Sequence, residues 1–240
     1  MTALEKAKFN SASAAVRHVD RNMVLGVGTG STVAYFVKLL GEKARREGLK
    51  LEAVPTSHYT ALLLIEHGIK VVSLDEYPEV DLTVDGADEV DPHLNLIKGG
   101  GAALTREKVV ASSSKKVVII VDHTKLVTSL GEKTPVPVEV LPFAWKSVTK
   151  KLESLGAKPK LRDAGRAKDG PVITDNGNFI LDVEFPAIQQ PKVVEQAVKS
   201  IPGVVEVGIF TDLADLVYVG YEDKVESKEK PSDRKMHKAH

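Results

Sequence analysis

The residues with the clearest chemical potential lie in one stretch, DLTVDGADEVDPHLNLIKGGGAALTREK, which spans residues 81–108. It combines carboxylates at Asp85 and Asp88, an amine at Lys98, three consecutive glycines and a further carboxylate at Glu107. A positioned carboxylate can take a proton and return it. An ammonium group and backbone N–H groups can stabilise the negative charge that develops meanwhile. The stretch therefore predicts proton transfer through an anionic intermediate.

The same stretch is a poor way to build a stable core. Several carboxylates crowd one turn, and the glycines at 99–101 carry a high conformational-entropy cost. Such a sequence suits a place where a ligand approaches the backbone closely, because successive N–H groups at a helix start accept an anion. The structural alternative is a solvated acidic turn followed by a flexible glycine hinge.

A second candidate loop, GVGTGST, spans residues 26–32 between a predicted strand and a predicted helix. Its spacing departs from the dinucleotide fingerprint G-x-G-x-x-G, whose third glycine would fall on Ser31 or Val33. Only Glu52, near the end of the next strand, keeps a dinucleotide cofactor open. The N–H groups and hydroxyls of the loop suit a single phosphate monoester. The alternative without a ligand is a helix start capped by Ser31 or Thr32.

The acidic turn resembles a cation site, but its spacing does not fit one. Ala87 and Glu89 stand where a calcium loop needs Asp or Asn, and no two histidines are spaced i, i+4. The chain has no cysteine, which excludes disulfides and thiolate ligands and fits a reducing cytoplasm. We therefore expect no metal, and a cytoplasmic protein.

Composition excludes several function classes. The 240 residues are 42% hydrophobic and 28% charged, with 33 basic and 33 acidic side chains. A broad nucleic-acid surface normally shows a basic excess, so no nucleic-acid partner is expected. No segment approaches the roughly 18 apolar residues of a membrane span, and the first twenty residues lack the apolar core of a secretory signal.

Strand and helix patterns alternate through the first half of the chain, which predicts a doubly wound, mainly parallel α/β sheet. Strands are predicted at 23–27, 51–54, 71–74, 82–84 and 116–121, and helices at 3–19, 33–47, 59–67 and 102–111. In such sheets ligands gather at the carboxyl ends of the strands. Both candidate loops follow predicted strands, so we expect them to meet at one cleft.

The second half predicts a smaller inserted α+β domain at 131–204, with a hairpin turn around Asn176-Gly177. The α/β domain then comprises residues 1–130 plus about 205–222, where apolar segments at 204–210 and 216–219 can return to its sheet. Residues 223–240 are charged, and we expect a disordered tail there.

Three motifs together resemble the ribose-5-phosphate isomerases of the A type. They are GTGST at 28–32, DGADE at 85–89 and KGGGAALTREK at 98–108, in this order, and the resemblance runs from the first helix to about Tyr221. It implies an α/β fold with a smaller inserted domain, a homodimer or homotetramer, and a small sugar phosphate as substrate. The activity it implies is interconversion of ribose 5-phosphate and ribulose 5-phosphate without metal or organic cofactor.

The resemblance also implies roles for individual residues. Glu107 matches the proton-transferring base, Asp85 and Asp88 match carboxylates that contact the sugar hydroxyls and assist ring opening, and Lys98 matches the lysine beside the enediolate. Lys8 matches an N-terminal lysine near the phosphate, with Lys6 as a competitor. The remaining matches to substrate-binding positions are Thr29, Gly30, Ser31, Thr32, Gly86, Ala87, Gly99, Gly100, Gly101 and Lys125.

Two other functions stay open on the residues alone. One is a non-catalytic sugar-phosphate sensor, in which the phosphate loop binds an effector and Glu107 is dispensable. The other is a nucleotide-dependent oxidoreductase, which the glycine spacing disfavours.

Overall fold

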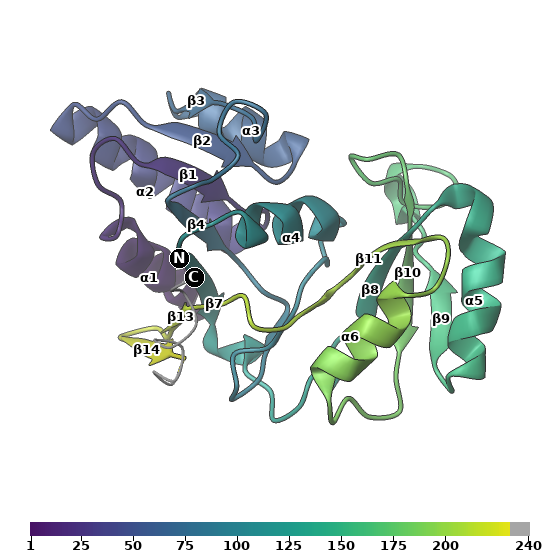
Figure 1. Cartoon of the computed structure of the whole chain (residues 1–240). Coiled ribbons are helices and arrows are strands. Elements are labelled where there is room, and N and C mark those ends of the chain that lie inside the picture. Colours follow the sequence, from purple (N-terminus) through teal and green to yellow (C-terminus); the bar gives the residue numbers. More distant parts are fainter. Residues whose placement is uncertain (231–240) are drawn as a thin grey trace, which may run out of the picture.

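The computed structural model describes residues 1–230, and a seven-stranded sheet forms the larger of two units (Figure 1). The strand order is β14-β13-β7-β4-β1-β2-β3, and every neighbouring pair is parallel except β13 and β14. The strands are β1 (Val24–Val27), β2 (Glu52–Pro55), β3 (Lys70–Val71), β4 (Leu82–Asp85), β7 (Val117–Asp122), β13 (Leu216–Gly220) and β14 (Val225–Glu229). This arrangement confirms the predicted doubly wound, mainly parallel sheet.

Helices cover both faces of this sheet. They are α1 (Ala3–Val16), α2 (Ser31–Glu47), α3 (His58–Glu66) and α4 (Leu104–Ser112). All six residues of β7 are buried, as expected of a strand covered on both sides. Val118 and Ile120 pack in the core that contains the apolar residues of α1 and α2, whereas Ile119 and Val121 pack in the core that contains Leu104 of α4. None of the helices within residues 1–230 has the length and apolarity needed to cross a bilayer.

Close packing fixes α1 against the sheet. Its start is defined by a capping box, in which Thr2 and Glu5 each accept the other's backbone N–H. At β13, a Cβ on Gly220 would lie 1.9 Å from the carbonyl oxygen of Ala7, so only glycine permits this approach. The contact holds Lys8, the next residue of α1, near the carboxyl ends of the strands.

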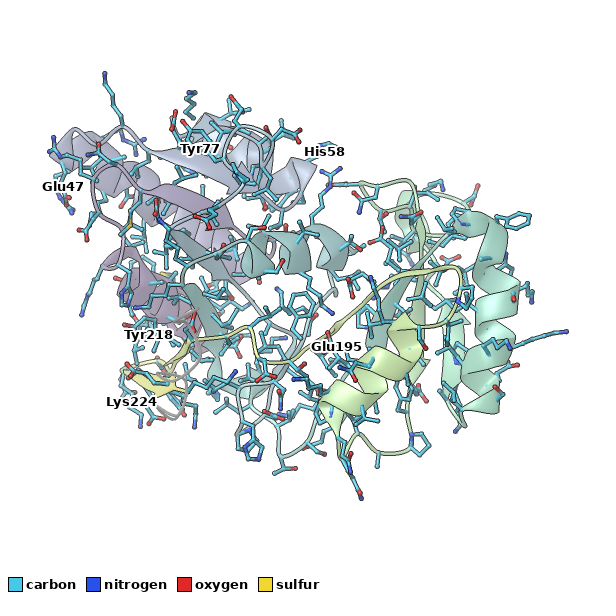
Figure 2. All side chains as sticks on the ribbon, in the orientation of Figure 1. Glu47, His58, Tyr77, Glu195, Tyr218 and Lys224 are labelled. Carbon is cyan, nitrogen blue, oxygen red and sulfur yellow. The ribbon has the colours of Figure 1, made fainter. Side chains whose placement is uncertain are left out.

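The smaller unit is built on an antiparallel sheet with the order β11-β8-β10-β9. Its elements are β8 (Val136–Val140), η2 (Pro142–Ala144), α5 (Trp145–Ser154), β9 (Lys158–Leu161), η3 (Gly165–Ala167), β10 (Phe179–Glu184), α6 (Pro191–Lys199) and β11 (Val204–Val207). A three-stranded sheet is formed by β5 (Glu89–Val90) and β6 (Leu96–Ile97), which follow β4, and by β12 (Ile209–Phe210), which connects β11 of the smaller sheet to β13 of the larger one. Figure 2 shows His58 and Glu195 where side chains of the two units approach each other.

Two expectations about the last third of the chain are wrong. Val204–Val207 pairs with β8 in the smaller sheet and does not return to the larger one. Residues 225–229, predicted as part of a disordered tail, form β14 and pair with all five residues of β13. A charged sequence can occupy an edge strand, because backbone groups make the pairing and charges protect the outer edge. The rest of the predicted tail, residues 231–240, lies outside the described residues.

Candidate active site

The pocket lies where the chain reverses its winding. From β1 the chain moves to β2 and β3 on one side, and it then returns to β4, β7 and β13 on the other. The carboxyl ends of β1 and β4 therefore flank the switch point, where doubly wound folds bind ligands. The two candidate loops meet there, since Gly28 N–H donates to the Val84 carbonyl at 2.9 Å and Thr29 N–H donates to Asp85 Oδ1 at 3.2 Å.

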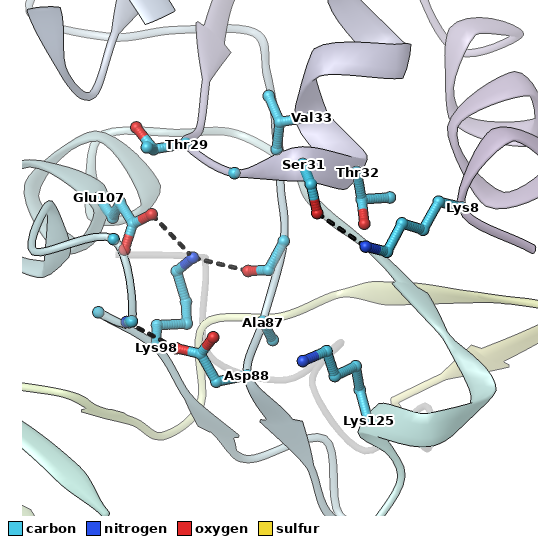
Figure 3. A pocket seen from close by; sticks show the side chains of 15 residues that line it. Lys8, Thr29, Ser31, Thr32, Val33, Ala87, Asp88, Lys98, Glu107 and Lys125 are labelled. Carbon is cyan, nitrogen blue, oxygen red and sulfur yellow. Dashed lines mark hydrogen bonds and ion pairs between the residues drawn. The ribbon is translucent and has the colours of Figure 1, made fainter. Parts of the chain in front are cut away.

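The structure brings together nearly every predicted site residue in one pocket (Figure 3). The lining residues are Lys8, Thr29, Gly30, Ser31, Thr32, Val33, Gly86, Ala87, Asp88, Lys98, Gly99, Gly100, Gly101, Glu107 and Lys125. Val33 is the one member that the sequence interpretation did not name. Asp85 is absent from the lining because it lies beneath the pocket and is 1% exposed. Its position differs from the expected direct contact with sugar hydroxyls.

Lys98 is the centre of the site. Its Nζ donates to the Gly86 carbonyl at 2.6 Å and lies 2.9 Å from Asp85 Oδ2 and 3.3 Å from Glu107 Oε1. All three side chains are buried, with Lys98 and Glu107 each 3% exposed. One hydrogen bond and two ion pairs therefore surround the ammonium group. Lys98 is thereby held at a fixed point at the base of the pocket.

One lysine cannot neutralise two buried carboxylates. Burial raises the pKa of Glu107 from its ordinary value of 4.5 to about 8, and the nearby charge of Asp85 adds to this rise while Lys98 opposes it. Burial also raises the pKa of Asp85, against the effects of Lys98 and of two backbone N–H donors. For Lys98 burial acts to lower the pKa, but Asp85 and Glu107 outweigh it and raise that pKa. The centre therefore keeps a charged lysine and a carboxyl group that exchanges its proton near neutral pH.

Glu107 has one carboxylate oxygen committed and one free. Oε1 faces Lys98, whereas Oε2 is buried and has no hydrogen-bond partner among residues 1–230. An unpaired buried oxygen is costly in a folded protein. Glu107 lines the pocket, and its backbone N–H donates to the Ala103 carbonyl at the start of α4 at 3.0 Å. The arrangement suits a proton acceptor aimed at bound substrate.

The glycine loop at 99–101 lies between Lys98 and α4 and lines the same pocket. Gly100 N–H donates to Asp88 Oδ2 at 2.8 Å. Gly99 adopts φ +107°, a conformation that glycine tolerates, and Ala102 adopts φ +58° just before α4. A Cβ on Gly100 would lie 2.7 Å from Asp88 Oδ1. The glycines thus allow the loop backbone to approach the carboxylate directly.

The loop after β1 forms an anion-accepting end of the pocket. Gly30, at φ +134°, is the N-cap residue of α2 and provides no side-chain cap. The alternative in which Ser31 or Thr32 caps this helix is therefore wrong, and the first N–H groups of α2 remain open to a ligand. Lys8 Nζ donates to Ser31 Oγ at 2.9 Å, and Lys125 approaches from η1 (His123–Lys125).

Of the two N-terminal lysines, the structure brings Lys8 to the pocket. Lys6 pairs with Glu222 at 2.9 Å and is not part of the lining.

The Thr29 hydroxyl lies within 2.8–3.1 Å of the hydroxyls of Thr56, Ser57 and Thr60. This hydroxyl cluster holds the loop from behind, a contact between distant segments that no local motif signalled.

Metal-ligating side chains do not converge at this site. Within residues 1–230 no three His, Cys, Asp or Glu side chains are grouped so that they could hold a metal ion. The positive charge beside the carboxylates comes from Lys98. Chemistry without a metal remains a prediction, and the assay described below tests it.

The fold and the site are those of an enzyme that acts on a small molecule, since a pocket at the carboxyl ends of the parallel strands holds Lys98 beside buried carboxylates. The model of the family "Ribose 5-phosphate isomerase A (phosphoriboisomerase A)" matches residues 52–224. The chain belongs to this family.

Similar proteins cover almost the whole chain. Ribose-5-phosphate isomerase A of Pyrococcus horikoshii is 50% identical over 228 residues, which span 95% of this chain and 99% of that protein. The structure of ribose 5-phosphate isomerase A from Methanocaldococcus jannaschii superimposes with a TM-score of 0.91 at 45% identity, over 94% of this chain and 99% of the other. A D-ribose-5-phosphate isomerase solved in complex with phospho-erythronic acid has a TM-score of 0.91 and 50% identity, over 95% of this chain and all of the other.

Proposed function

We propose that the chain interconverts ribose 5-phosphate and ribulose 5-phosphate through an enediolate, with Glu107 as the proton-transfer base. The observation that carries the proposal is the free, buried Oε2 of Glu107 at the wall of a pocket that also contains Lys98. The pKa of Glu107, raised to about 8 by burial, makes it a stronger base than an exposed carboxylate. Relatives that carry the name of this isomerase and share 50% sequence identity with the chain support the choice of substrate.

The reaction moves one proton between neighbouring carbons. With the sugar in its open-chain form, the Glu107 carboxylate removes the proton from C2 of the aldose, and the electron pair moves onto the C1 carbonyl oxygen. The same carboxyl group then returns the proton to C1, while the C2 hydroxyl proton passes to the oxygen on C1. Lys98 stabilises the negative oxygen of the enediolate. Asp85, beneath the pocket, holds Lys98 in position at 2.9 Å.

The other end of the pocket supplies groups for a phosphate. The open N-terminus of α2, the Ser31 and Thr32 hydroxyls, Lys8 and Lys125 offer N–H, O–H and ammonium donors. Asp88 and the glycine loop at 99–101 then face the sugar. The expected homodimer or homotetramer remains a prediction, which light scattering on the eluting protein would test.

The test is conversion of ribose 5-phosphate to ketose by the purified protein, with and without a chelator. We expect turnover that the chelator leaves unchanged. Glu107→Gln keeps the size of the side chain but removes the base, and we expect it to lose on the order of 100-fold or more in kcat. Ligand-induced stabilisation by ribose 5-phosphate controls for binding in this variant. Near-normal kcat in Glu107→Gln would remove Glu107 from the role.

A further inference from the structure

Arg162 is a residue of the smaller unit that contacts the pocket's glycine loop. It follows β9 directly, and its backbone is fixed by hydrogen bonds between Arg162 N–H and the Ile180 carbonyl, and between Val172 N–H and the Arg162 carbonyl, both at 2.9 Å. Its Nε donates to Asp182 Oδ2 at 2.9 Å, and its Nη2 donates to the other oxygen of the same carboxylate. This two-point contact fixes the plane of the guanidinium group.

The third nitrogen of the guanidinium reaches the larger unit. Nη1 donates to the Gly99 carbonyl at 2.9 Å and to the Gly100 carbonyl at 3.1 Å. Both glycines line the pocket, whereas Arg162 and Asp182 do not. One donor group therefore holds two successive peptide carbonyls of the loop from outside the pocket.

Peptide geometry converts this contact into an orientation of donors. A trans peptide unit directs its N–H opposite to its C=O, and residues 1–230 contain no cis peptide bond. The Gly99 carbonyl shares its unit with the N–H of Gly100, and the Gly100 carbonyl shares its unit with the N–H of Gly101. Because Arg162 binds both carbonyls, both N–H groups are directed away from it. Gly100 N–H meets Asp88 at 2.8 Å, and Gly101 N–H has no partner among the described residues.

The peptide unit of Gly99 and Gly100 is also held by Ala102 N–H on the Gly99 carbonyl at 2.9 Å and by Gly100 N–H on Asp88. Among the described residues, the unit of Gly100 and Gly101 is held by Arg162 alone. Glycine adopts positive and negative φ at similar conformational energy, and Gly99 lies at φ +107°. A lysine at position 162 could not reproduce the contact, since one ammonium cannot bind a carboxylate at two points and also reach two carbonyls.

We propose that Arg162, held by Asp182, is a positioning residue that keeps the Gly100 N–H on Asp88 and directs the free N–H of Gly101 toward the reacting end of the substrate. The inference rests on the proposed isomerase function and adds to it a dependence on the smaller unit. Donors that are oriented before the reaction stabilise developing negative charge at no cost of reorganisation. The loss of Arg162 therefore reduces turnover more than it weakens substrate binding.

The experiment compares kcat and KM of Arg162→Ala, Arg162→Lys and Asp182→Asn with the wild type. Removing one oxyanion donor costs about 100- to 1000-fold in kcat. A loop that samples other orientations keeps its donor in place for only part of the time, so its loss of kcat is smaller. We expect kcat to fall about 10- to 100-fold in Arg162→Ala and Arg162→Lys, less in Asp182→Asn, and KM to change by less than about threefold. Arg166→Ala removes an exposed arginine from the same unit and serves as the matched control.

Chemical rescue separates positioning from stability. Low-millimolar guanidinium chloride can occupy the space left in Arg162→Ala, and we expect it to restore part of kcat there but not in Arg162→Lys. Equal sodium chloride is the salt control. Unchanged kcat in a folded Arg162→Ala would overturn the inference, as would a loss of kcat that follows thermal unfolding and shows no rescue. A wild-type protein without isomerase activity would instead refute the proposed function itself.

Discussion

At the scale of single residues, the site depends on an unequal division of donors between two carboxylates. Asp85 accepts backbone N–H bonds from Thr29 and Gly86 besides its ion pair with Lys98. Glu107 has only Lys98, and its second oxygen is unpaired within residues 1–230. Hydrogen bonds to a carboxylate stabilise its charged form. Glu107 is therefore the group that holds a proton near neutral pH, and Asp85 is the fixed counter-charge of Lys98.

The first prediction concerns the pH dependence of the rate. In the proposed mechanism the carboxylate form of Glu107 removes the proton from carbon, and burial raises its pKa to about 8. We expect kcat/KM to rise about tenfold per pH unit below that value and to level off above it. The measurement is kcat/KM between about pH 6.5 and 9, where the substrate phosphate, with a pKa of about 6, is already ionised. A profile that is flat across this range would contradict the assignment.

The second prediction links the same group to stability. The pKa of Glu107 is higher in the folded protein than its ordinary value of 4.5, so the folded state binds a proton that the unfolded state releases. This contribution to the free energy of unfolding is complete below pH 4.5 and is lost as pH rises through about 8. Glu107→Gln removes the titration. We expect the variant to gain stability relative to the wild type as pH rises from 5 to about 9.

Urea unfolding at several pH values measures this difference. The comparison uses the change in the free energy of unfolding between variant and wild type at each pH, which cancels the titration of groups that the two proteins share. A difference that stays constant from pH 5 to 9 would contradict the raised pKa of Glu107 in the folded state.

A further prediction at a single residue tests the contact between the two loops. A Cβ on Gly28 would lie 1.8 Å from Asp85 Oδ1. Gly28→Ala therefore displaces the Asp85 carboxylate from its N–H donors and shifts Lys98, which is paired with it. We expect a fall in kcat of about tenfold or more, the range for a mispositioned catalytic group. Thermal unfolding of the variant controls for loss of the fold, and an unchanged kcat would show that Asp85 does not position Lys98.

At the scale of elements, α4 is the helix that the smaller unit holds in place. The residues beside Glu107 all reach that unit: Thr105 donates to Glu139, Arg106 donates to Asn176, and Lys108 bonds to Glu195 and Glu206. Glu107 itself faces the pocket (Figure 3). One helix thus presents Glu107, the proposed base, to the pocket while its neighbouring side chains fix the rotation of the helix.

Glu139 is the buried anchor of this arrangement. Its carboxylate is fully buried on β8 and accepts hydrogen bonds from Thr105, Thr174, Asn176 and Asn178. Glu139→Gln leaves four donors with one oxygen fewer and no charge. Hydrogen bonds to charged groups contribute about 1.5–3 kcal/mol each, so we expect the free energy of unfolding to fall by roughly 2–3 kcal/mol.

Urea unfolding of Glu139→Gln provides the measurement for this element. Glu153→Gln, at an exposed position on α5, is the matched control and is expected to change stability by less than about 0.5 kcal/mol. Equal stability of the two variants would contradict a structural role for the Glu139 cluster.

The elements also show which parts of the site could be predicted. Glu107, Lys98 and the glycines occur within a dozen residues of one another, and their order along the chain already specifies their chemistry. Arg162 lies more than sixty residues from the carbonyls that it binds, and Glu139 lies more than thirty from each donor. Their contacts depend on how two sheets pack together, and no local spacing records that packing. The strand β14 was missed for a related reason. Its charged sequence carries no apolar strand pattern, and its strand conformation depends on backbone pairing with β13.

At the scale of the whole molecule, the pocket and the sheet edge are separated by two strands. The pocket lies at the carboxyl ends of β1 and β4, whereas β14 lies beyond β7 and β13. Removing residues 223–240 exposes β13 as a new edge and removes its antiparallel pairing. With a net contribution of about 1 kcal/mol per hydrogen bond, we expect the free energy of unfolding to fall by roughly 2–4 kcal/mol.

The same truncation is expected to leave kcat within about twofold of the wild type, since none of the pocket residues belongs to the deleted segment. A chain that ends after Lys230 keeps β14 and is the matched control for the truncation at residue 223. Thermal unfolding and kcat of the three proteins, measured at a temperature where all are folded, decide the matter. A truncated chain as stable as the control would show that β14 contributes nothing to the sheet. A large loss of kcat at full stability would instead show that the edge strand communicates with the pocket.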